Sequence, residues 1–405
     1  MGRFKSPERG LRRRDMLGLM VGAGAGAAIA PLSAQAGPGR SRVQLVRDEF
    51  IAPRGVLRVR WSRPLVSRIP FFSYKPQEFA SAAVSSDGKL VFIGSSQKRL
   101  YAFHAATGEV AWDRAFASSL SSHPLYLKEG IVGPEALLIL GDDTGLVSAL
   151  EARGGQQRWS YRARGPVQTL PVVHGGLIYL TSNEGRIYAL DVRTGSWRWQ
   201  YERETPDAFS IRGQAGPLIV DGKLFIGFPD GYLSCLNSET GEVIWNRQLS
   251  GESTRFADVD GTPAMLGDAL IVSCYASGLF ALEVKDGTTR WRNELEAAGS
   301  FAVDPQNERV YAVSATQGIF CIDKKGRKLW QQVMTGQGEL SMPTLWKKYL
   351  LVSAAISGLH VADAETGELL QYFDPGQGST AQPVAQGSEV YLLSNAGSFF
   401  ALTSG

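Results

Sequence analysis

The chain has 405 residues, of which 44% are hydrophobic and 20% charged, values that are ordinary for a globular protein able to bury a large core. Its net charge of +3 comes from the N-terminus, because residues 1–36 hold six Arg or Lys against two Asp or Glu, which leaves −1 for the remainder. The charge therefore gives no reason to expect a nucleic acid or an anionic membrane surface as a partner.

Residues 1–36 have the features of an export signal. LRRRDML (Leu11–Leu17) places twin arginines before a short, weakly apolar run, and Ala34–Ala36 supplies a small-x-small cleavage site. This pattern resembles a twin-arginine signal, and a general secretory signal is the alternative. The residue after the expected cut is Gly37 and not cysteine, so no lipid attachment is predicted there. Residues 37–55 carry Gly, Pro and charges without periodicity, and we expect a mobile leader.

Val56–Leu65 (VLRVRWSRPL) is a lone strand-like segment that carries a tryptophan. After it, one unit recurs along the chain, most clearly in Gly251–Trp291. There the runs TPAML, ALIVSCYA, LFALEV and TTRW are separated by the turns GD, SG and KDG. Short runs rich in β-branched and aromatic residues, joined by such turns, indicate a four-stranded antiparallel meander.

Seven copies of this unit share one ending, in which a polar residue precedes a turn glycine and a tryptophan follows it. The turn glycines are 47, 40, 46, 46, 39 and 41 residues apart, and a period of this length with four strands per unit is typical of β-propeller blades. The glycines are Gly108, Gly155, Gly195, Gly241, Gly287, Gly326 and Gly367. The tryptophans are Trp112, Trp159, Trp199, Trp245, Trp291 and Trp330, and the seventh copy has Gln371 instead.

An eighth unit begins at Ala381 and supplies three strands before the sequence ends. Pairing its third strand with Val56–Leu65 would complete this blade and remove two exposed sheet edges. We therefore predict an all-β, eight-bladed propeller over residues 56–405, built from four-stranded antiparallel blades, with the last blade closed by an N-terminal strand. The tryptophans are expected to pack between blades, and the polar residue before each turn glycine to accept hydrogen bonds from the turn backbone.

Signals for catalysis or for a bound metal are weak. The four histidines (His104, His123, His174 and His360) fall in four different blades, and Cys235, Cys274 and Cys321 fall in three, so neither set has the spacing of a metal site. We expect the cysteines to be buried free thiols. Gly141–Gly145 (GDDTG) has paired aspartates, which hairpin turns also favour. The sequence therefore predicts no catalytic residue, no metal and no cofactor, and hence no enzyme.

The repeat ending A-x-[DEN]-x-x-x-G-x-x-x-W resembles the repeat of pyrroloquinoline-quinone dehydrogenases. That resemblance implies adjacent cysteines, a Ca²⁺ held by Glu and Asn oxygens, and a catalytic Asp. The chain has no adjacent cysteines, and its acidic residues fall mostly in turns. A quinone-binding or redox-associated propeller is therefore kept only as an alternative.

A second resemblance is more specific. Phe256–Leu295 (FADVDGTPAMLGDALIVSCYASGLFALEVKDGTTRWRNEL), the bridge FAVDPQNERVYAV and the ending QPVAQGSEVYLLSNAGSFFAL are similar to the BamB family, the periplasmic propellers of the outer-membrane β-barrel assembly machinery. In that family two blade-connecting loops bind the central barrel subunit.

The resemblance implies that the partner-binding residues are Phe209, Ile211 and Arg212 of the motif FSIRG, together with Asp258 and Asp260 of DVD. Apolar anchors, an arginine and paired carboxylates are a reasonable set for protein recognition. The alternative is that these residues brace neighbouring loops within the molecule, and both roles are compatible.

The sequence as a whole predicts a non-enzymatic periplasmic scaffold for outer-membrane β-barrel assembly, whose membrane association comes only through its protein partner. An envelope scaffold with a different protein partner is the remaining alternative.

Overall fold

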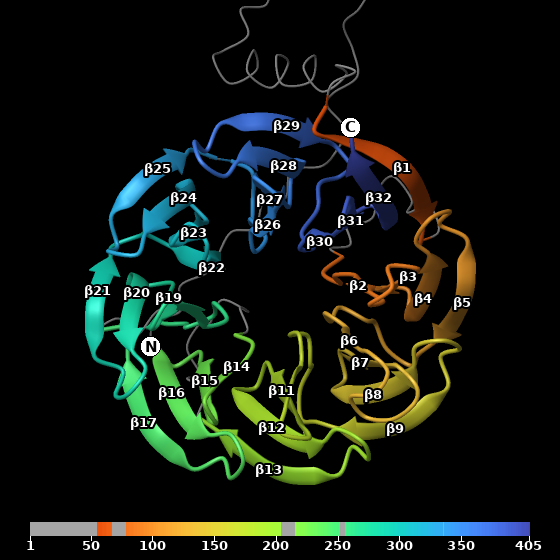
Figure 1. Cartoon of the computed structure of the whole chain (residues 1–405), viewed down its shortest axis with the longest axis horizontal. Helices are drawn as coiled ribbons and strands as arrows, with labels where there is room; N and C mark the ends of the chain where they lie inside the picture. Colours follow the sequence, from red (N-terminus) through yellow and green to blue (C-terminus); the bar gives the residue numbers. More distant parts are fainter. Residues whose placement is uncertain (1–54, 67–77, 204–214, 252–255, 335) are drawn as a thin grey trace, which may run out of the picture. The chain divides into compact units, whose positions relative to one another are not determined.

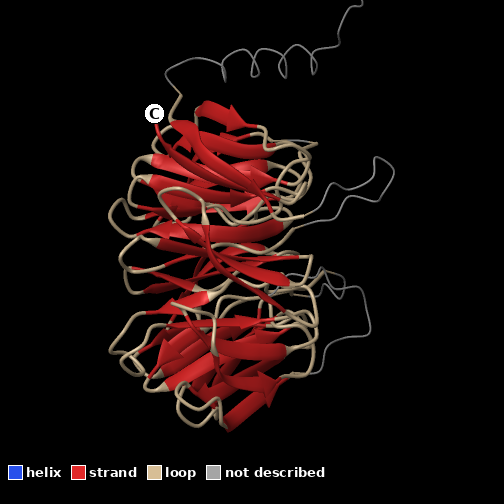
Figure 2. Ribbon diagram, turned by 90° about the vertical axis from the view of Figure 1, so that its right-hand side faces the viewer, coloured by secondary structure: helices blue, strands red, loops and turns tan. Residues whose placement is uncertain are grey.

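Eight four-stranded antiparallel sheets form a closed ring in the computed structural model, which describes residues 55–66, 78–203, 215–251, 256–334 and 336–405 (Figure 1). The prediction of an eight-bladed propeller is confirmed. We name the four strands of each blade A to D in order from the centre of the ring to its rim. The described residues form strands and connecting loops (Figure 2). The expected export signal and all of the expected leader except Gly55 lie outside the described residues, and both remain predictions.

The blades follow the chain in order. Blade 1 is β2 (Ala83–Val84), β3 (Leu90–Ser95), β4 (Arg99–His104) and β5 (Val110–Ala115); blade 2 is β6 (Leu125–Leu127), β7 (Leu137–Gly141), β8 (Leu146–Glu151) and β9 (Gln157–Arg162). Blade 3 is β10 (Val172–His174), β11 (Leu177–Ser182), β12 (Arg186–Asp191) and β13 (Trp197–Glu202); blade 4 is β14 (Leu218–Val220), β15 (Lys223–Gly227), β16 (Tyr232–Asn237) and β17 (Val243–Gln248). Blade 5 is β18 (Ala264–Leu266), β19 (Ala269–Cys274), β20 (Gly278–Glu283) and β21 (Thr289–Asn293); blade 6 is β22 (Ala298–Asp304), β23 (Arg309–Ser314), β24 (Gly318–Asp323) and β25 (Lys328–Gln332). Blade 7 is β26 (Thr344–Trp346), β27 (Tyr349–Ala354), β28 (Gly358–Asp363) and β29 (Leu369–Phe373); blade 8 is β30 (Val384–Gln386), β31 (Glu389–Leu393), β32 (Ser398–Ser404) and β1 (Leu57–Pro64).

Blade 8 contains both ends of the propeller. Its outermost strand, β1, pairs antiparallel with β32, from Leu57 opposite Ser404 to Pro64 opposite Ser398. The Gly405 backbone N–H also donates to the Val56 carbonyl at 3.0 Å. The predicted closure of the ring by an N-terminal strand is therefore confirmed.

The central strands B and C explain the apolar runs of the sequence. Each blade packs between two others, so both faces of these strands are covered, and they read as nearly continuous apolar segments rather than alternating ones. In β3 five of the six residues are buried, and in β19 all six are. The outer strands have one face toward solvent and carry more polar residues, as in β13 (WRWQYE).

Seven of the eight outer strands carry a tryptophan that packs on the following blade, and a repeated local irregularity lies beside this position. In every blade the pairing of strands C and D shifts register beside the residue opposite this side chain, as a β-bulge does. The residue opposite is small where a tryptophan is present. These small residues are Ala102, Ala149, Ala189, Cys235, Ala281, Cys321 and Ala401. The two cysteines thus take alanine positions, and all three cysteines are buried and unpaired.

Each of these indoles lies against the C–D turn glycine of the next blade. A Cβ placed on any of the seven turn glycines would come within 2.5–2.9 Å of the ring, and the glycine φ angles of 69–81° favour glycine independently. The pairs are Trp61–Gly108, Trp112–Gly155, Trp159–Gly195, Trp199–Gly241, Trp245–Gly287, Trp291–Gly326 and Trp330–Gly367. Trp61 belongs to β1, so the N-terminal strand carries its own copy of this contact.

Six of the indoles also donate a hydrogen bond into the next blade. The acceptors are the carbonyls of Ala105, Ala152, Val192, Ser238, Lys324 and Ala364, at 2.8–3.3 Å from Nε1. Trp245 packs in the same way, although its buried Nε1 has no hydrogen-bond partner among the described residues. We refer to the packing of indole on glycine, together with this bond where it forms, as the blade interlock.

The polar residue before the turn glycine makes one of two kinds of contact in six of the seven repeats. Asp191, Asn237, Asp323 and Asp363 each accept two backbone N–H groups of their own turn at 2.8–3.1 Å. The longer Glu151 and Glu283 instead pair with arginines of the following strand.

Gln371 occupies the tryptophan position of blade 7, and its neighbour explains the difference. Blade 8 has no C–D turn at this point, because its third and fourth strands come from opposite ends of the propeller. The Gln371 side chain is 8% exposed, accepts from the Leu57 backbone N–H and donates to the Leu57 carbonyl, both at 2.7 Å. The amide therefore holds β1 at the junction of blades 7 and 8, where no turn glycine is available for an indole. We call this junction the seam.

The blade interlock predicts that two tryptophans of β13 contribute very differently to the stability of the fold. Trp199 is 7% exposed and packs on Gly241, whereas Trp197 is 53% exposed. We expect Trp199→Ala to lower the free energy of unfolding by about 3–5 kcal/mol, because it removes a large buried side chain and leaves a cavity. Trp197→Ala serves as the control and should change it by less than about 1 kcal/mol. Urea unfolding checks both, and equal losses would contradict the assignment.

Gln371→Leu tests the seam. Leucine keeps the bulk but leaves the Leu57 N–H and carbonyl without their partner, at about 1–3 kcal/mol for each buried group. We expect a lower melting temperature than that of Gln200→Leu, a matched change at an exposed position of β13. If the two variants melt together, the amide does not hold the seam.

Candidate functional site

The predicted partner-binding residues fall in two connectors that reach the same face of the ring. Because successive strands are antiparallel, the B–C turns and the D–A connectors emerge on one face and the A–B and C–D turns on the other. Residues 203–217 connect blade 3 to blade 4, and residues 249–263 connect blade 4 to blade 5. We call the side bearing the B–C turns and D–A connectors the connector face.

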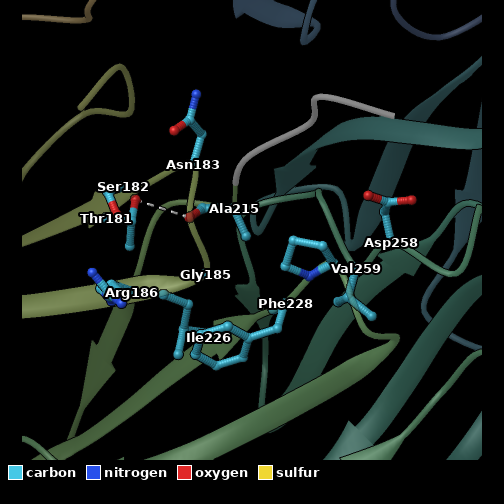
Figure 3. A pocket seen from close by; sticks show the side chains of 12 residues that line it. Thr181, Ser182, Asn183, Gly185, Arg186, Ala215, Ile226, Phe228, Asp258 and Val259 are labelled. Atoms are coloured by element: carbon cyan, nitrogen blue, oxygen red, sulfur yellow. Dashed lines mark hydrogen bonds between the residues drawn. The ribbon is translucent and has the colours of Figure 1, made fainter. Parts of the chain in front are cut away.

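The structure brings described parts of both connectors together. Phe209, Ile211 and Arg212 lie outside the described residues. Ala215, which follows closely, lines one pocket with Asp258 of the second connector (Figure 3). The B–C turns of blades 3 and 4 complete the lining of this pocket. Thr181 Oγ1 donates to the Ala215 carbonyl at 3.2 Å and so ties the first connector to blade 3.

The backbone of the DVD segment braces blade 4 against blade 5. The Val259 N–H donates to the Phe228 carbonyl at 3.2 Å, and the Asp258 carbonyl accepts from the Tyr275 N–H at 3.0 Å. Val259 is 1% exposed and lies so close to Gly227 that a Cβ there would meet the Val259 carbonyl oxygen at 2.1 Å.

The same bracing recurs in earlier connectors, where Leu120 and Val167 take the place of Val259 against Gly94 and Gly141. The DVD backbone therefore has the bracing role that was the alternative to partner binding. It leaves the role of the two carboxylates open.

The two aspartates differ in their surroundings. Asp258 is 1% exposed in the isolated chain, whereas Asp260 is partly accessible. Asp260 Oδ1 is buried without a hydrogen-bond partner among the described residues. Burial, followed by the nearby charges of Asp258 and Glu339, raises the pKa of Asp260 to about 7. Burial also raises the pKa of Glu339. A cation brought by a partner would stabilise these carboxylates in their charged form.

The paired aspartates of the GDDTG turn, which were considered as a possible cation site, have hydrogen-bond partners within the protein. In the GDDTG turn, Asp142 Oδ1 accepts from the Thr144 and Leu146 N–H groups, and the Asp143 carboxylate accepts from Ser121 and Gln168. The aspartates thus brace the turn and the adjacent connectors.

Two of the histidines are held neutral by the fold. Burial lowers the pKa of both His123 and His360 to about 4, and these rings contact Ser81 and Ser357 respectively. Among the residues that the structure describes, no group of three or more His, Cys, Asp or Glu side chains is placed to hold a metal ion. The same residues include no helix long and apolar enough to cross a membrane.

Comparison with known proteins identifies the family. The family model of outer membrane protein assembly factor BamB matches residues 57–132 and 127–332, which include both connectors. The chain belongs to this family.

Curated relatives extend the match over most of the chain. It is 26% identical to the outer membrane protein assembly factor BamB of Yersinia pestis over 327 residues, 78% of this chain and 82% of the relative. It is 28% identical to BamB of Shewanella oneidensis over 333 residues, 77% of this chain and 82% of the relative. The crystal structure of BamB from Moraxella catarrhalis has the same fold, with a TM-score of 0.72 and 22% identity over 86% of this chain and 100% of that one.

Asp260 should make the stability of the propeller depend on pH. Its pKa in the folded chain, about 7, lies above the ordinary value of 3.8, so the folded state holds this proton more tightly than the unfolded state. The resulting stability is fully present below about pH 4 and is lost as the pH rises through 7. Between pH 5 and pH 8 we expect the contribution of Asp260 to the free energy of unfolding to fall by on the order of 2 kcal/mol, while His123 and His360, with their lowered pKa values, contribute in the opposite sense.

Asp260→Asn should remove this contribution, so the melting temperature of the wild type should fall relative to that of the variant as the pH rises from 5 to 8, as measured by thermal melts at half-unit pH steps. Asp221→Asn, at an exposed A–B turn of blade 4 on the opposite face, is the control and should keep the wild-type slope. If the melting temperatures of the wild type and of Asp260→Asn change identically with pH, Asp260 does not contribute to the pH dependence of stability.

Proposed function

We propose that this protein is a non-enzymatic scaffold of outer-membrane β-barrel assembly, which binds the central barrel subunit of the assembly machinery through its connector face. The observation that carries the proposal is the family match across residues 57–332, a range that contains both predicted binding loops. The names of the curated relatives describe assembly factors, which supports a role in protein assembly rather than in catalysis.

The geometry supports a single binding patch. Ala215 and Asp258 line one pocket, so the end of the first connector and the start of DVD lie close together on the connector face. We assign Phe209, Ile211, Arg212, Asp258 and Asp260 to this patch. Asp260 combines a buried oxygen with partial exposure, and a basic side chain of the partner would offset the cost of burying this carboxylate. Asp258 supplies the brace through its backbone and adds negative charge beside Asp260.

We infer that the chain works in the periplasm after export directed by residues 1–36. The absence of a cysteine after the expected cleavage site means that the protein would reach the outer membrane through its partner. A quinone-binding propeller and an envelope scaffold with a different protein partner are the alternatives that the experiment below separates.

Affinity capture from detergent-solubilised envelopes tests the proposal. Wild-type protein should recover the barrel subunit of the assembly machinery. Arg212→Glu and Asp260→Asn should each reduce recovery about tenfold or more, because each removes a charge that the proposal assigns to the contact with the partner. Asp258 is a poor test position, because a substitution at a buried brace affects folding as well.

Two exposed changes on the opposite face serve as controls. Lys89→Glu matches the charge reversal, and Asp221→Asn matches the loss of a carboxylate. Both should leave recovery and melting temperature unchanged. Capture of another envelope protein without the barrel subunit, or isolation with an absorbing quinone, would favour the respective alternative.

A further inference from the structure

Phe256 is an exposed aromatic residue in a backbone conformation that disfavours it. Its φ is 53°, in the left-handed region, and its side chain is 43% exposed. A bulky non-glycine residue in this region is strained, and such strain is concentrated at functional sites. The other described non-glycine residues with positive φ are not aromatic: Lys98, Asp221, Ala297, Glu308, Lys347 and Gln377.

The chain around Phe256 is anchored on the C-terminal side of this residue. Ala257 is 7% exposed, and its carbonyl accepts from Cys274 Sγ at 3.3 Å. Val259 is buried against Gly227 and bonded to Phe228, as described above. The left-handed turn at Phe256 therefore leads directly into a segment that the fold holds in place.

The ring contacts blade 5 but is only partly covered by it. It lies 6.0 Å from the Tyr275 ring at an interplanar angle of 57°, and the Tyr275 N–H holds the Asp258 carbonyl at 3.0 Å. Asparagine or glycine would suit this backbone better. Packing within the isolated chain thus leaves a large part of this strained aromatic side chain open to a partner.

We propose that Phe256 is an aromatic anchor, which inserts into an apolar pocket of the protein partner that docks on the connector face. This inference rests on the proposed function and adds a residue to its patch. Asp260 lies four residues further along the same braced segment, so the matching surface on the partner is an apolar pocket beside a basic side chain. Pre-ordered aromatic side chains are the usual energetic centres of such interfaces.

The experiment compares Phe256→Asn with Phe256→Leu in titrations against the purified periplasmic region of the barrel subunit. Asparagine tolerates the left-handed backbone and removes the ring, and leucine keeps an apolar side chain. We expect Phe256→Asn to raise Kd roughly 10- to 30-fold. Phe256→Leu should stay within about threefold of wild type. Ile131→Ala, at a residue with 45% exposure in the A–B loop of blade 2 on the opposite face, is the matched control and should bind like wild type.

Thermal melting separates binding from folding. Phe256→Asn should melt within about 2 °C of wild type or higher, because it relieves backbone strain. If Phe256→Asn lowers the melting temperature by more than about 5 °C and Phe256→Leu does not, the ring is a structural contact and the proposal is wrong. If wild type does not bind the barrel subunit, the proposed function fails and this inference with it. If wild type binds, Asp260→Asn weakens binding and Phe256→Asn does not, the anchor alone is refuted.

Discussion

The structure depends on the packing of an indole of one blade on the turn glycine of the next. A four-stranded blade has two apolar faces and cannot bury both alone, so its stability comes from neighbours on each side. One buried tryptophan removes roughly 150–250 Å² from water, about 4–6 kcal/mol gross at ~25 cal/mol per Å². The contact needs a bulge, a small opposing residue and a glycine turn together, which is why these features recur in register. Repeated around the ring, it makes the blades a fixed platform for their connectors.

The seam shows that this interlock is chemically specific. At seven junctions the indole meets a glycine turn, and Trp61 of the N-terminal strand obeys the same rule toward Gly108. At the eighth, the turn is missing, and the apolar ring is replaced by an amide that bonds both backbone groups of Leu57. An indole has one donor and no acceptor, so it could not satisfy an N–H and a carbonyl at once. The exception in the repeat follows from the position of the chain ends.

The sequence predicted the architecture well, because blade structure is local and periodic. The spacing of the turn glycines, the apolar runs and the two partial units identified eight blades and the strand that closes them. The environment of the connector face was not predictable in the same way. The burial of Asp258 and the raised pKa of Asp260 arise from contacts between different blades, and the left-handed φ of Phe256 is not a feature of the repeat. A repeat pattern carries no information about such contacts. From the sequence alone, the DVD segment could therefore serve either in partner binding or in bracing neighbouring loops.

Under the proposed function, the connector between blades 4 and 5 combines those two roles by dividing them among its atoms. Its backbone and the Val259 side chain brace the ring, while the Phe256 ring and part of Asp260 remain accessible. Bracing and recognition therefore reinforce each other, because a segment fixed by packing loses little conformational entropy when a partner binds. The buried oxygen of Asp260 adds a charge requirement to this surface. A partner that brings a cation stabilises the carboxylate, whereas a purely apolar partner would leave it more desolvated than before. If the proposed function holds, the contacts that hold the propeller together also select a partner surface that is both apolar and basic.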